Sequence, residues 1–166
     1  MPLPNWLPEL FEVNPWTDAT FGRLYEIFVR DFKGVNLRLD GVPVRYFADL
    51  DTDGKELIFW YLVSKEDASE GDRLPDFSRC ARLPWVAAVI SNSNQPEVTK
   101  WDFREAKGYV NTYFWLKEFD FVVILRKFKN GSCRLITAFC VEGNGTKRTL
   151  ESKFQRREKP ADETPV

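Results

Sequence analysis

The side chains of this chain that could carry out chemistry are arginine, lysine, tyrosine and threonine, because the sequence contains no histidine. That absence excludes paired-imidazole ribonucleases, Ser-His and Cys-His nucleophile systems, and every metal site with a histidine ligand. Metal-independent RNA cleavage needs a base near the ribose 2′-hydroxyl, cations that stabilise a charged phosphorane, and a proton donor to the departing 5′-oxygen. Arginine, lysine and tyrosine side chains meet these needs without imidazole, so the composition is compatible with a ribonuclease.

Two arginines stand out among these residues. Arg79 and Arg82 are three residues apart in a segment that we expect to be helical, so they share one face of that helix. Two guanidinium groups side by side favour binding of a phosphate. The alternative interpretation is that they pair with the acidic residues that precede them in the chain and hold a helix against the sheet.

Other common chemical motifs are absent or incomplete. The acidic run at residues 49–54 superficially resembles a calcium loop, but the required glutamate is missing because position 60 is Trp60. The glycines at residues 143–145 are better explained as a turn before a helix than as a phosphate-binding loop. We therefore expect neither a metal nor a cofactor.

The three cysteines are Cys80, Cys133 and Cys140. They are too few and too poorly spaced for a zinc site, and their odd number does not suit a disulfide framework. Cys133 and Cys140 are seven residues apart, so on a regular strand they face opposite sides. We interpret all three as reduced structural thiols.

Charge is distributed unevenly along the chain, although the net charge is only −1. Residues 49–72 hold eight acids and two bases, a local charge of −6. Residues 122–160 hold ten bases and three acids, a local charge of +7. The basic segment favours a phosphate-bearing partner, and a solvated basic helix with no such partner is the alternative.

The clearest predicted helix follows Thr17, a good N-cap residue, and ends at Gly34. Apolar side chains recur at helical spacing along it: Phe21, Leu24, Tyr25, Phe28 and Phe32. Residues 75–90 are expected to form a helix or two short helices, because Pro84 fits best in the first turn of a new one. Thr146 is expected to cap a final helix in which Leu150 and Phe154 face the sheet.

Strands are predicted in two groups. Residues 35–39 and 42–47 flank Asp40-Gly41, a strong hairpin signal, and Pro43 suggests that the second arm is an edge strand. Residues 57–63 are a candidate buried strand. Residues 109–116, 121–128 and 133–141 form three successive β patterns, the last two joined by an Asn-Gly turn, and predict an antiparallel meander.

These elements predict a single α+β domain over residues 1–160. N-terminal helices pack on a four- or five-stranded, mainly antiparallel sheet, and a basic helix follows at the C-terminal end. Residues 161–166 are expected to form a mobile tail. The N-terminal residues lack the basic region and apolar core of a signal peptide, and the longest apolar runs are too short to span a membrane, so we expect a cytoplasmic protein.

Several stretches together resemble the phage-associated members of the barnase–EndoU–colicin–RelE nuclease superfamily. They are the run from Arg73 to Trp85, which ends in Arg-Leu-Pro-Trp, the aromatic segment 112–116, the segments 120–125 and 134–139, and the basic terminal helix. The similarity covers roughly residues 17–158. It implies a small α+β fold and metal-independent RNA cleavage in toxin or phage-conflict settings. RNA is the implied substrate, and a cognate antitoxin or immunity protein is the implied second partner.

The resemblance also implies site residues. Arg79 and Arg82 match the basic pair ahead of the Pro-Trp, and Thr137 matches a hydroxyl residue of the penultimate strand. Tyr61 occupies a position where such a family would carry histidine, so it becomes the candidate proton donor or, with a lowered pKa, the candidate base. The candidate RNA-binding residues are Lys147, Lys153, Arg156, Arg157 and Trp85.

Each candidate site residue has a structural alternative. Tyr61 and Trp85 are also suited to packing in the core or at its rim, and a β-branched Thr137 fits a strand for packing reasons alone. We hypothesise that the chain is a metal-independent endoribonuclease that cleaves through the 2′-hydroxyl to a 2′,3′-cyclic phosphate. The alternative is a non-catalytic protein- or RNA-binding module on the same fold, such as a phage accessory factor or a neutralising partner.

Overall fold

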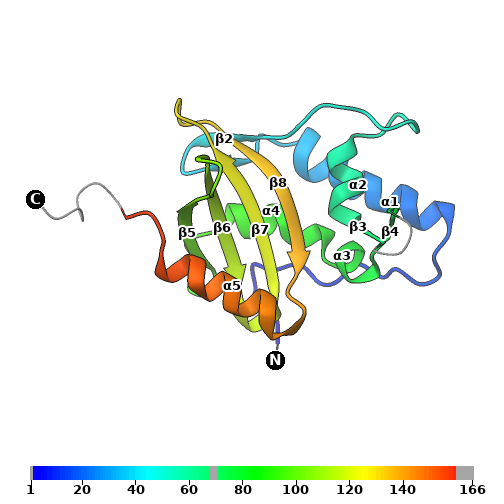
Figure 1. Cartoon of the computed structure of the whole chain (residues 1–166). Coiled ribbons are helices and arrows are strands. Elements are labelled where there is room, and N and C mark those ends of the chain that lie inside the picture. The colour runs from blue at the N-terminus through cyan, green and yellow to red at the C-terminus, as the bar shows by residue number, and fades with distance from the viewer. Residues whose placement is uncertain (1, 68–70, 160–166) are drawn as a thin grey trace, which may run out of the picture.

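A curved six-stranded sheet occupies the centre of the computed structural model, which describes residues 2–67 and 71–159 (Figure 1). Its strands are β1 (Arg38–Leu39), β2 (Val42–Arg45), β5 (Thr99–Arg104), β6 (Val110–Leu116), β7 (Phe121–Lys127) and β8 (Cys133–Cys140). They lie in the order β1-β2-β8-β7-β6-β5. Neighbours are antiparallel except β2 and β8, which are parallel. The fold is therefore α+β, as the sequence predicts.

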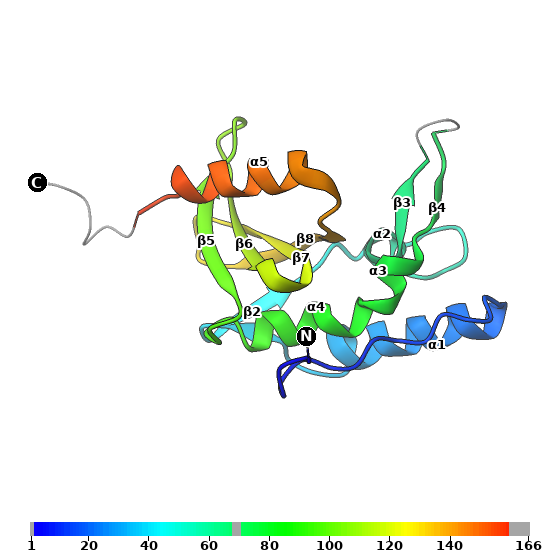
Figure 2. The ribbon, with the colours of Figure 1, turned by 90° about the horizontal axis from the view of Figure 1, so that it is seen from below.

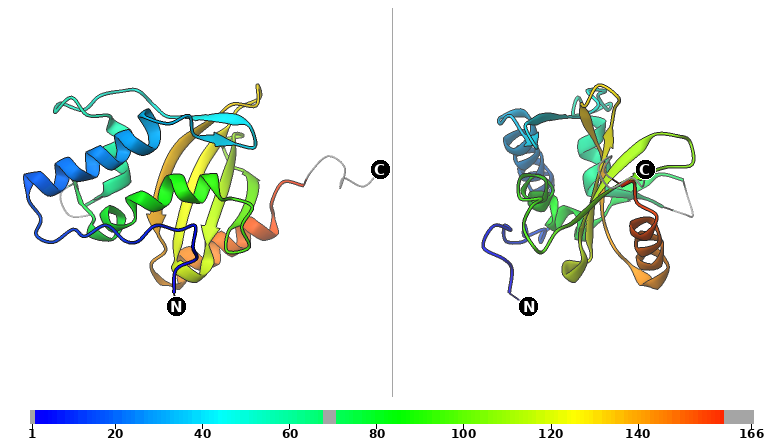
Figure 3. Two further views of the ribbon diagram at one scale, coloured as in Figure 1. Left: turned by 180° about the vertical axis from the view of Figure 1, so that it is seen from behind. Right: turned by 90° about the vertical axis from the view of Figure 1, so that its left-hand side faces the viewer.

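Helices cover both faces of this sheet. They are α1 (Asp18–Phe28) with a π-helical continuation (Val29–Lys33), α2 (Leu57–Val63), α3 (Phe77–Ala81), α4 (Leu83–Ser91), a 3₁₀ turn (Lys117–Phe119) and α5 (Gly143–Gln155). Figures 2 and 3 show α1 and α4 on one side of the sheet and α5 on the other. A small hairpin of β3 (Ser64–Glu66) and β4 (Arg73–Pro75) projects from the α2 and α3 region toward the α5 side (Figure 2).

The first helix forms as predicted. The Thr17 hydroxyl accepts a hydrogen bond from the Thr20 backbone N–H, and the Thr20 hydroxyl accepts one from the Thr17 N–H, so the two residues complete a capping box. Leu24 and Phe28 are fully buried on the face that the apolar spacing predicts. The helical hydrogen bonding then widens to the π type at residues 29–33 and ends at Gly34.

Two apolar clusters hold the layers together. The larger lies between the sheet and the helices α1, α2 and α4, and it includes Phe59, Phe114 and Leu135. The smaller lies under α5, where Leu150 and Phe154 pack against the outer face of the sheet, as the sequence predicts. In this cluster the Trp101 and Tyr113 rings stack with centroids 5.0 Å apart.

The prediction of a strand over residues 57–63 is wrong, because this segment is helix α2. Its buried side chains are Ile58, Phe59, Leu62 and Val63. That spacing of one, four and five residues places all of them on one face of a helix. A seven-residue apolar run has no polar positions to reveal its period, so packing against α1 and the sheet decides its structure.

Three smaller expectations also need correction. The main sheet has six strands rather than four or five, because the hairpin strands β1 and β2 join it and β5 extends it. Strand β2 is not the edge strand, since it lies between β1 and β8. Pro43 is tolerated there because β2 pairs with β8 only at Val44 and Arg45. Helix α5 begins at Gly143 after Glu142, so Thr146 lies inside it rather than at its cap.

The break between α3 and α4 and the antiparallel meander of β6, β7 and β8 are confirmed. Pro84 occupies the first turn of α4, as predicted. In the described part of the chain, no helix has the length and apolar character needed to cross a membrane. The predicted tail at residues 161–166 lies outside the described residues.

Candidate functional site

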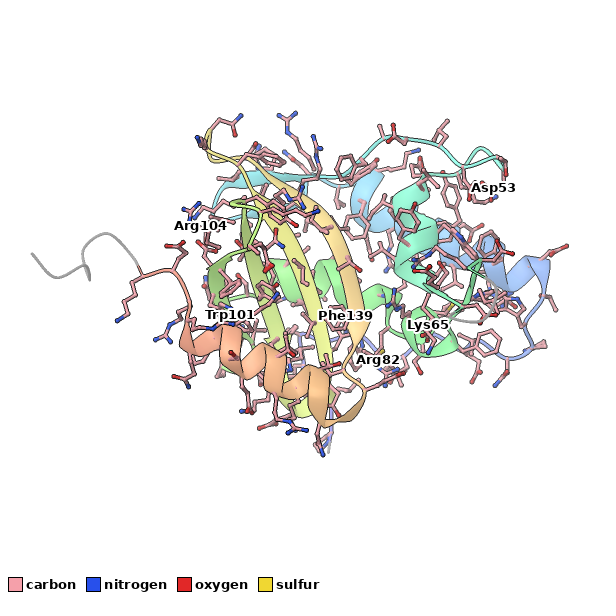
Figure 4. The ribbon with its side chains drawn as sticks, viewed as in Figure 1. Asp53, Lys65, Arg82, Trp101, Arg104 and Phe139 are labelled. Atoms are coloured by element: carbon pink, nitrogen blue, oxygen red, sulfur yellow. The ribbon has the colours of Figure 1, made fainter. Side chains whose placement is uncertain are left out.

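A pocket of about 580 Å³ opens between β8 and the β3–β4 hairpin. The described residues that line it are Tyr61, Lys65, Glu66, Gly71, Arg73, Arg79, Ile136 and Thr137. Three of the four residues predicted as catalytic, Tyr61, Arg79 and Thr137, therefore lie in one pocket although they come from three different elements. In Figure 4, Lys65 lies on the side of β8 that faces α3.

Two guanidinium groups meet on the backbone at the end of α2. Arg79 Nη1 donates to the carbonyl oxygens of Ser64 at 2.8 Å and Tyr61 at 3.2 Å. Arg73 Nη2 donates to the same two oxygens at 2.7 and 3.4 Å, and its Nε donates to the Ser64 hydroxyl at 2.9 Å. Carbonyls at a helix C-terminus carry partial negative charge, which helps to hold two cations together.

Neither guanidinium has a carboxylate within ion-pair distance among the described residues, although Glu66 lines the same pocket. Burial lowers the pKa of Arg73, and the neighbouring Arg79 charge lowers it further. Both side chains keep N–H groups that donate to no described residue, because a guanidinium has five such groups. The pair is therefore a partly desolvated cationic site with free donors.

The tyrosine is fixed by one of these arginines. The Arg73 guanidinium carbon lies 4.7 Å from the centroid of the Tyr61 ring, a cation–π contact. Tyr61 is 40% exposed, so its side chain is accessible to a ligand. Helix α2 places the ring at the pocket wall, which explains how a residue within an apolar run becomes part of a polar site.

Thr137 reaches the pocket because of a β-bulge. The register between β7 and β8 shifts so that Ile124 pairs with Thr137 while the next residue, Leu125, pairs with Leu135. The extra residue Ile136 and its neighbour Thr137 then both point away from the larger apolar cluster, toward the side that carries α5. Bulges are common beside functional sites because they redirect a side chain in this way.

The same bulge corrects the expectation for the cysteines of β8. Cys133 and Cys140 both pack in the larger cluster, on one face, because the extra residue shifts the alternation between them. Burial raises the pKa of both thiols, and it raises that of Cys80 to about 12. All three cysteines are free, consistent with their interpretation as structural thiols.

Arg82 does not line the pocket, so the predicted pairing of Arg79 with Arg82 is wrong. Arg82 lies where α3 ends and α4 begins, with φ −101° and ψ 6°, and this break removes the helical face that the two arginines were expected to share. Its Nη1 donates to the Ser78 carbonyl at 3.0 Å, and its guanidinium lies 5.3 Å from the Trp85 ring centroid. Figure 4 shows it between the end of β8 and α3.

Trp85 is part of the core and is not available to stack on a base. Only 2% of its surface is exposed, and its Nε1 donates to the Pro8 carbonyl at 2.7 Å. Its ring packs edge-on against Phe119 and Phe121. The prediction that it binds RNA is therefore wrong, and the packing alternative holds.

The candidate RNA-binding residues of α5 divide into two groups. Lys153 lies against the sheet, where its Nζ donates to Glu105 Oε1 at 2.9 Å and to the Tyr113 hydroxyl at 2.8 Å. It therefore anchors the helix rather than facing a ligand. Lys147 is half-buried, whereas Arg156 and Arg157 are exposed at the C-terminal end of α5.

Sequence reasoning missed Arg73 as a site residue, and Glu66 with it. The signal that could have found them is the hairpin itself, because Glu66 and Arg73 are paired residues of β3 and β4. Both strands are only three residues long, too short to show an alternating pattern. Arg73 takes the place that the sequence assigned to Arg82.

No family model matches the chain, and neither a curated protein nor a solved structure matches it. Within the described residues there is also no group of three or more cysteine, aspartate or glutamate side chains that could hold a metal ion. The pocket is therefore the feature of the chain that indicates a function. Two guanidinium groups, two hydroxyls, an ammonium and a carboxylate can bind an anionic group and move a proton beside it.

Proposed function

We propose that the chain is a metal-independent endoribonuclease that acts in the cytoplasm in a toxin or phage-conflict setting, in line with its resemblance to phage-associated members of the barnase–EndoU–colicin–RelE superfamily. The observation that supports this best is the pair Arg73 and Arg79, which have free N–H donors and no described carboxylate partner. A phosphodiester is an anion that such a pair recognises. The proposed cleavage site is the pocket that they share with Tyr61 and Thr137.

The division of roles follows from the chemistry of the side chains. Arg73 and Arg79 stabilise the charge of the phosphorane, and the Thr137 hydroxyl positions a phosphate oxygen. A base must take the proton of the ribose 2′-hydroxyl, and Glu66 and Tyr61 are the candidates for this role in the pocket. Whichever residue is not the base is available to position the substrate. The 2′-oxygen attacks phosphorus to form the 2′,3′-cyclic phosphate, the bond from phosphorus to the 5′-oxygen breaks, and the 5′-oxygen takes a proton from the Lys65 ammonium.

The test is incubation of the purified protein with total RNA in the presence of a chelator. We expect cleavage by the wild-type protein and its loss in Arg79→Ala, because one of the two cations is removed. Arg23→Ala is the matched control, since Arg23 is an exposed arginine on α1 that lies over the Phe11 ring, 5.9 Å from its centroid. No cleavage by the wild-type protein, or equal cleavage by both variants, would contradict the proposal.

The non-catalytic alternative has one observation in its favour. Both pocket arginines donate hydrogen bonds to the carbonyl oxygens of Tyr61 in α2 and of Ser64 just after it, so they also serve a structural purpose at the end of that helix. An RNA- or protein-binding module on this fold would keep those contacts and lack cleavage. The same assay separates the two functions, because RNA that is bound and recovered intact indicates the module.

A further inference from the structure

Three arginines lie next to one another on three neighbouring strands of the sheet and form a row. Arg45 of β2 pairs with Arg134 of β8, and Arg134 pairs with Arg126 of β7. Directly paired residues of neighbouring strands point to the same face of a sheet. On β8, Cys133 and Leu135 belong to the larger apolar cluster, so Arg134 points to the opposite face, the face that carries α5.

The row concentrates positive charge on one face of the sheet. None of the three arginines forms an ion pair with a described residue. Like charges placed directly opposite each other destabilise a sheet. In addition, the Nε atoms of Arg126 and Arg134 are buried without a hydrogen-bond partner, and so is Oδ1 of Asn111, the residue paired with Arg126 on β6. A ligand that supplies negative charge would offset this repulsion and could accept from the unpaired N–H groups.

Aromatic rings surround the row. The Arg126 guanidinium carbon lies 3.8 Å from the Tyr109 ring centroid, and that of Arg134 lies 4.3 Å from Phe47 and 5.2 Å from Phe128. Phe47 is 42% exposed and Phe128 is 36% exposed. Exposed rings beside stacked guanidinium groups offer flat surfaces on which unpaired bases can stack.

Strand β8 carries one residue of the row and one residue of the pocket. Arg134 and Thr137 are three residues apart on β8 and point to the same face, which corresponds to a separation of about 10 Å along the strand. Helix α5 crosses the other end of this face, where it covers Trp101 and Tyr113 (Figure 1). The uncovered end of the sheet and the pocket are therefore neighbouring parts of one surface.

We infer that this row binds the phosphate backbone of single-stranded RNA and guides it into the pocket. The inference rests on the proposed function, because it assigns the substrate path of the same site. Charge complementarity favours a polyanion, and the exposed rings favour unpaired bases over a duplex, whose bases are stacked inside. An acidic protein is the competing occupant, and the experiment is designed to distinguish it.

The experiment measures binding of a fluorescent single-stranded RNA by fluorescence anisotropy at several salt concentrations. The RNA is about 10 nucleotides long, within the usual length that a single-strand-binding domain covers. The oligonucleotide carries 2′-O-methyl groups, so it offers no nucleophile and stays intact. We expect Arg134→Gln and Arg126→Gln each to weaken binding on the order of tenfold, because each removes a charge-assisted contact. Each variant should also lower the slope of log affinity against log salt by about 0.7.

Arg23→Gln on α1 is the matched control and should leave both quantities unchanged. Arg45→Gln is a second variant for the case in which a substitution at Arg126 or Arg134 prevents folding, because the Arg45 side chain is exposed. Unchanged affinity in all the folded row variants would overturn the inference. Equal affinity for a duplex of the same sequence would overturn it, and so would binding of poly-glutamate in place of the oligonucleotide.

Failure of the inference and failure of the proposed function give different results. If only the inference fails, Arg79→Ala lowers the rate of cleavage by about 10²-fold while the row variants bind and cleave like the wild-type protein. If only the proposed function fails, no RNA is cleaved while the row variants still weaken binding of the oligonucleotide.

Discussion

Arg73 and Arg79 donate hydrogen bonds to the same backbone oxygen, that of Ser64, at 2.7 and 2.8 Å. This shared acceptor brings together two guanidinium groups that come from different elements, the hairpin strand β4 and helix α3. Because the acceptor is neutral, it does not offset the positive charge of the pair, as a carboxylate acceptor would. The relationship makes both arginines parts of one anion site.

The first prediction concerns these two residues. Arg73→Ala and Arg79→Ala should each lower the rate of RNA cleavage by about 10²-fold, because each removes a donor to the developing negative charge. The measurement is the initial rate on a fluorogenic RNA in chelator, with a thermal melt to verify folding. Arg82→Ala is the informative comparison, since Arg82 lies outside the pocket, and its rate should stay within about twofold of the wild-type rate. A large loss in Arg82→Ala alone would contradict this placement of the site.

The second prediction concerns the base. If Glu66 takes the 2′-hydroxyl proton, Glu66→Gln removes most of the cleavage while Tyr61→Phe retains it. If Tyr61 is the base, Tyr61→Phe removes most of the cleavage while Glu66→Gln retains it. The measurement is the initial rate of the wild-type protein and of the two variants on the same RNA in chelator. Full activity in both variants would contradict both assignments.

The third prediction separates anchoring from binding on α5. Burial lowers the pKa of Lys153, but hydrogen bonds to Tyr113 and Glu105 more than offset this, so the pKa is raised. The ammonium is therefore better stabilised in the folded state, and its contribution is present below pH 10 and declines as the pH rises beyond the ordinary lysine value of about 10.4. Lys153→Met should lower the melting temperature at pH 7 with oligonucleotide affinity unchanged.

The controls for this prediction are at the end of the same helix. Arg156→Gln and Arg157→Gln should leave the melting temperature unchanged, because both side chains are exposed. If the end of α5 contacts RNA, as the sequence predicts, these variants should also reduce the salt dependence of RNA binding. A Lys153→Met protein that melts like the wild-type protein would show that the contact with Glu105 and Tyr113 has no anchoring effect.

The fourth prediction concerns Glu56, a buried carboxylate that joins α2 to the π-helical segment. Its oxygens accept hydrogen bonds from Lys33 Nζ at 2.7 Å and from the Tyr25 hydroxyl at 2.9 Å. Burial raises the pKa of Glu56, but these hydrogen bonds outweigh it and the pKa is lowered. The folded state therefore prefers the charged form. The resulting stability is present above about pH 4.3, the ordinary glutamate value, and is lost as the pH falls through the lowered pKa.

Glu56→Gln should destabilise the fold by about 1–3 kcal/mol at pH 7, because it leaves the Lys33 ammonium without its partner. The measurement is denaturant unfolding at pH 7 and at pH 3. The difference between the variant and the wild-type protein should be smaller at pH 3 than at pH 7, because pH 3 lies below the ordinary glutamate pKa and the stability from the charged form is being lost there. Asp53→Asn is the control, because Asp53 is an exposed acid in the preceding loop. A difference that persists at low pH would contradict the ionic origin of the effect.

Local patterns determine several parts of this molecule. The Thr17 cap and the apolar spacing that follows it specify α1, and Pro84 specifies the start of α4. The aromatic and β-branched runs specify the meander, and Leu150 and Phe154 specify the inner face of α5. In each case the signal lies within a few residues, where hydrogen bonding and side-chain period act directly.

Tertiary structure decides the rest of the candidate site. The bulge that turns Thr137 into the pocket depends on the register of β8 against β7, and the position of Arg73 depends on a hairpin too short to show a period. Residues 57–63 become a helix because that conformation buries four side chains against their neighbours. The row of Arg45, Arg134 and Arg126 exists only because three strands align at those residues. Cross-strand register is set by packing between segments far apart in the chain, so no local pattern in the sequence can report it.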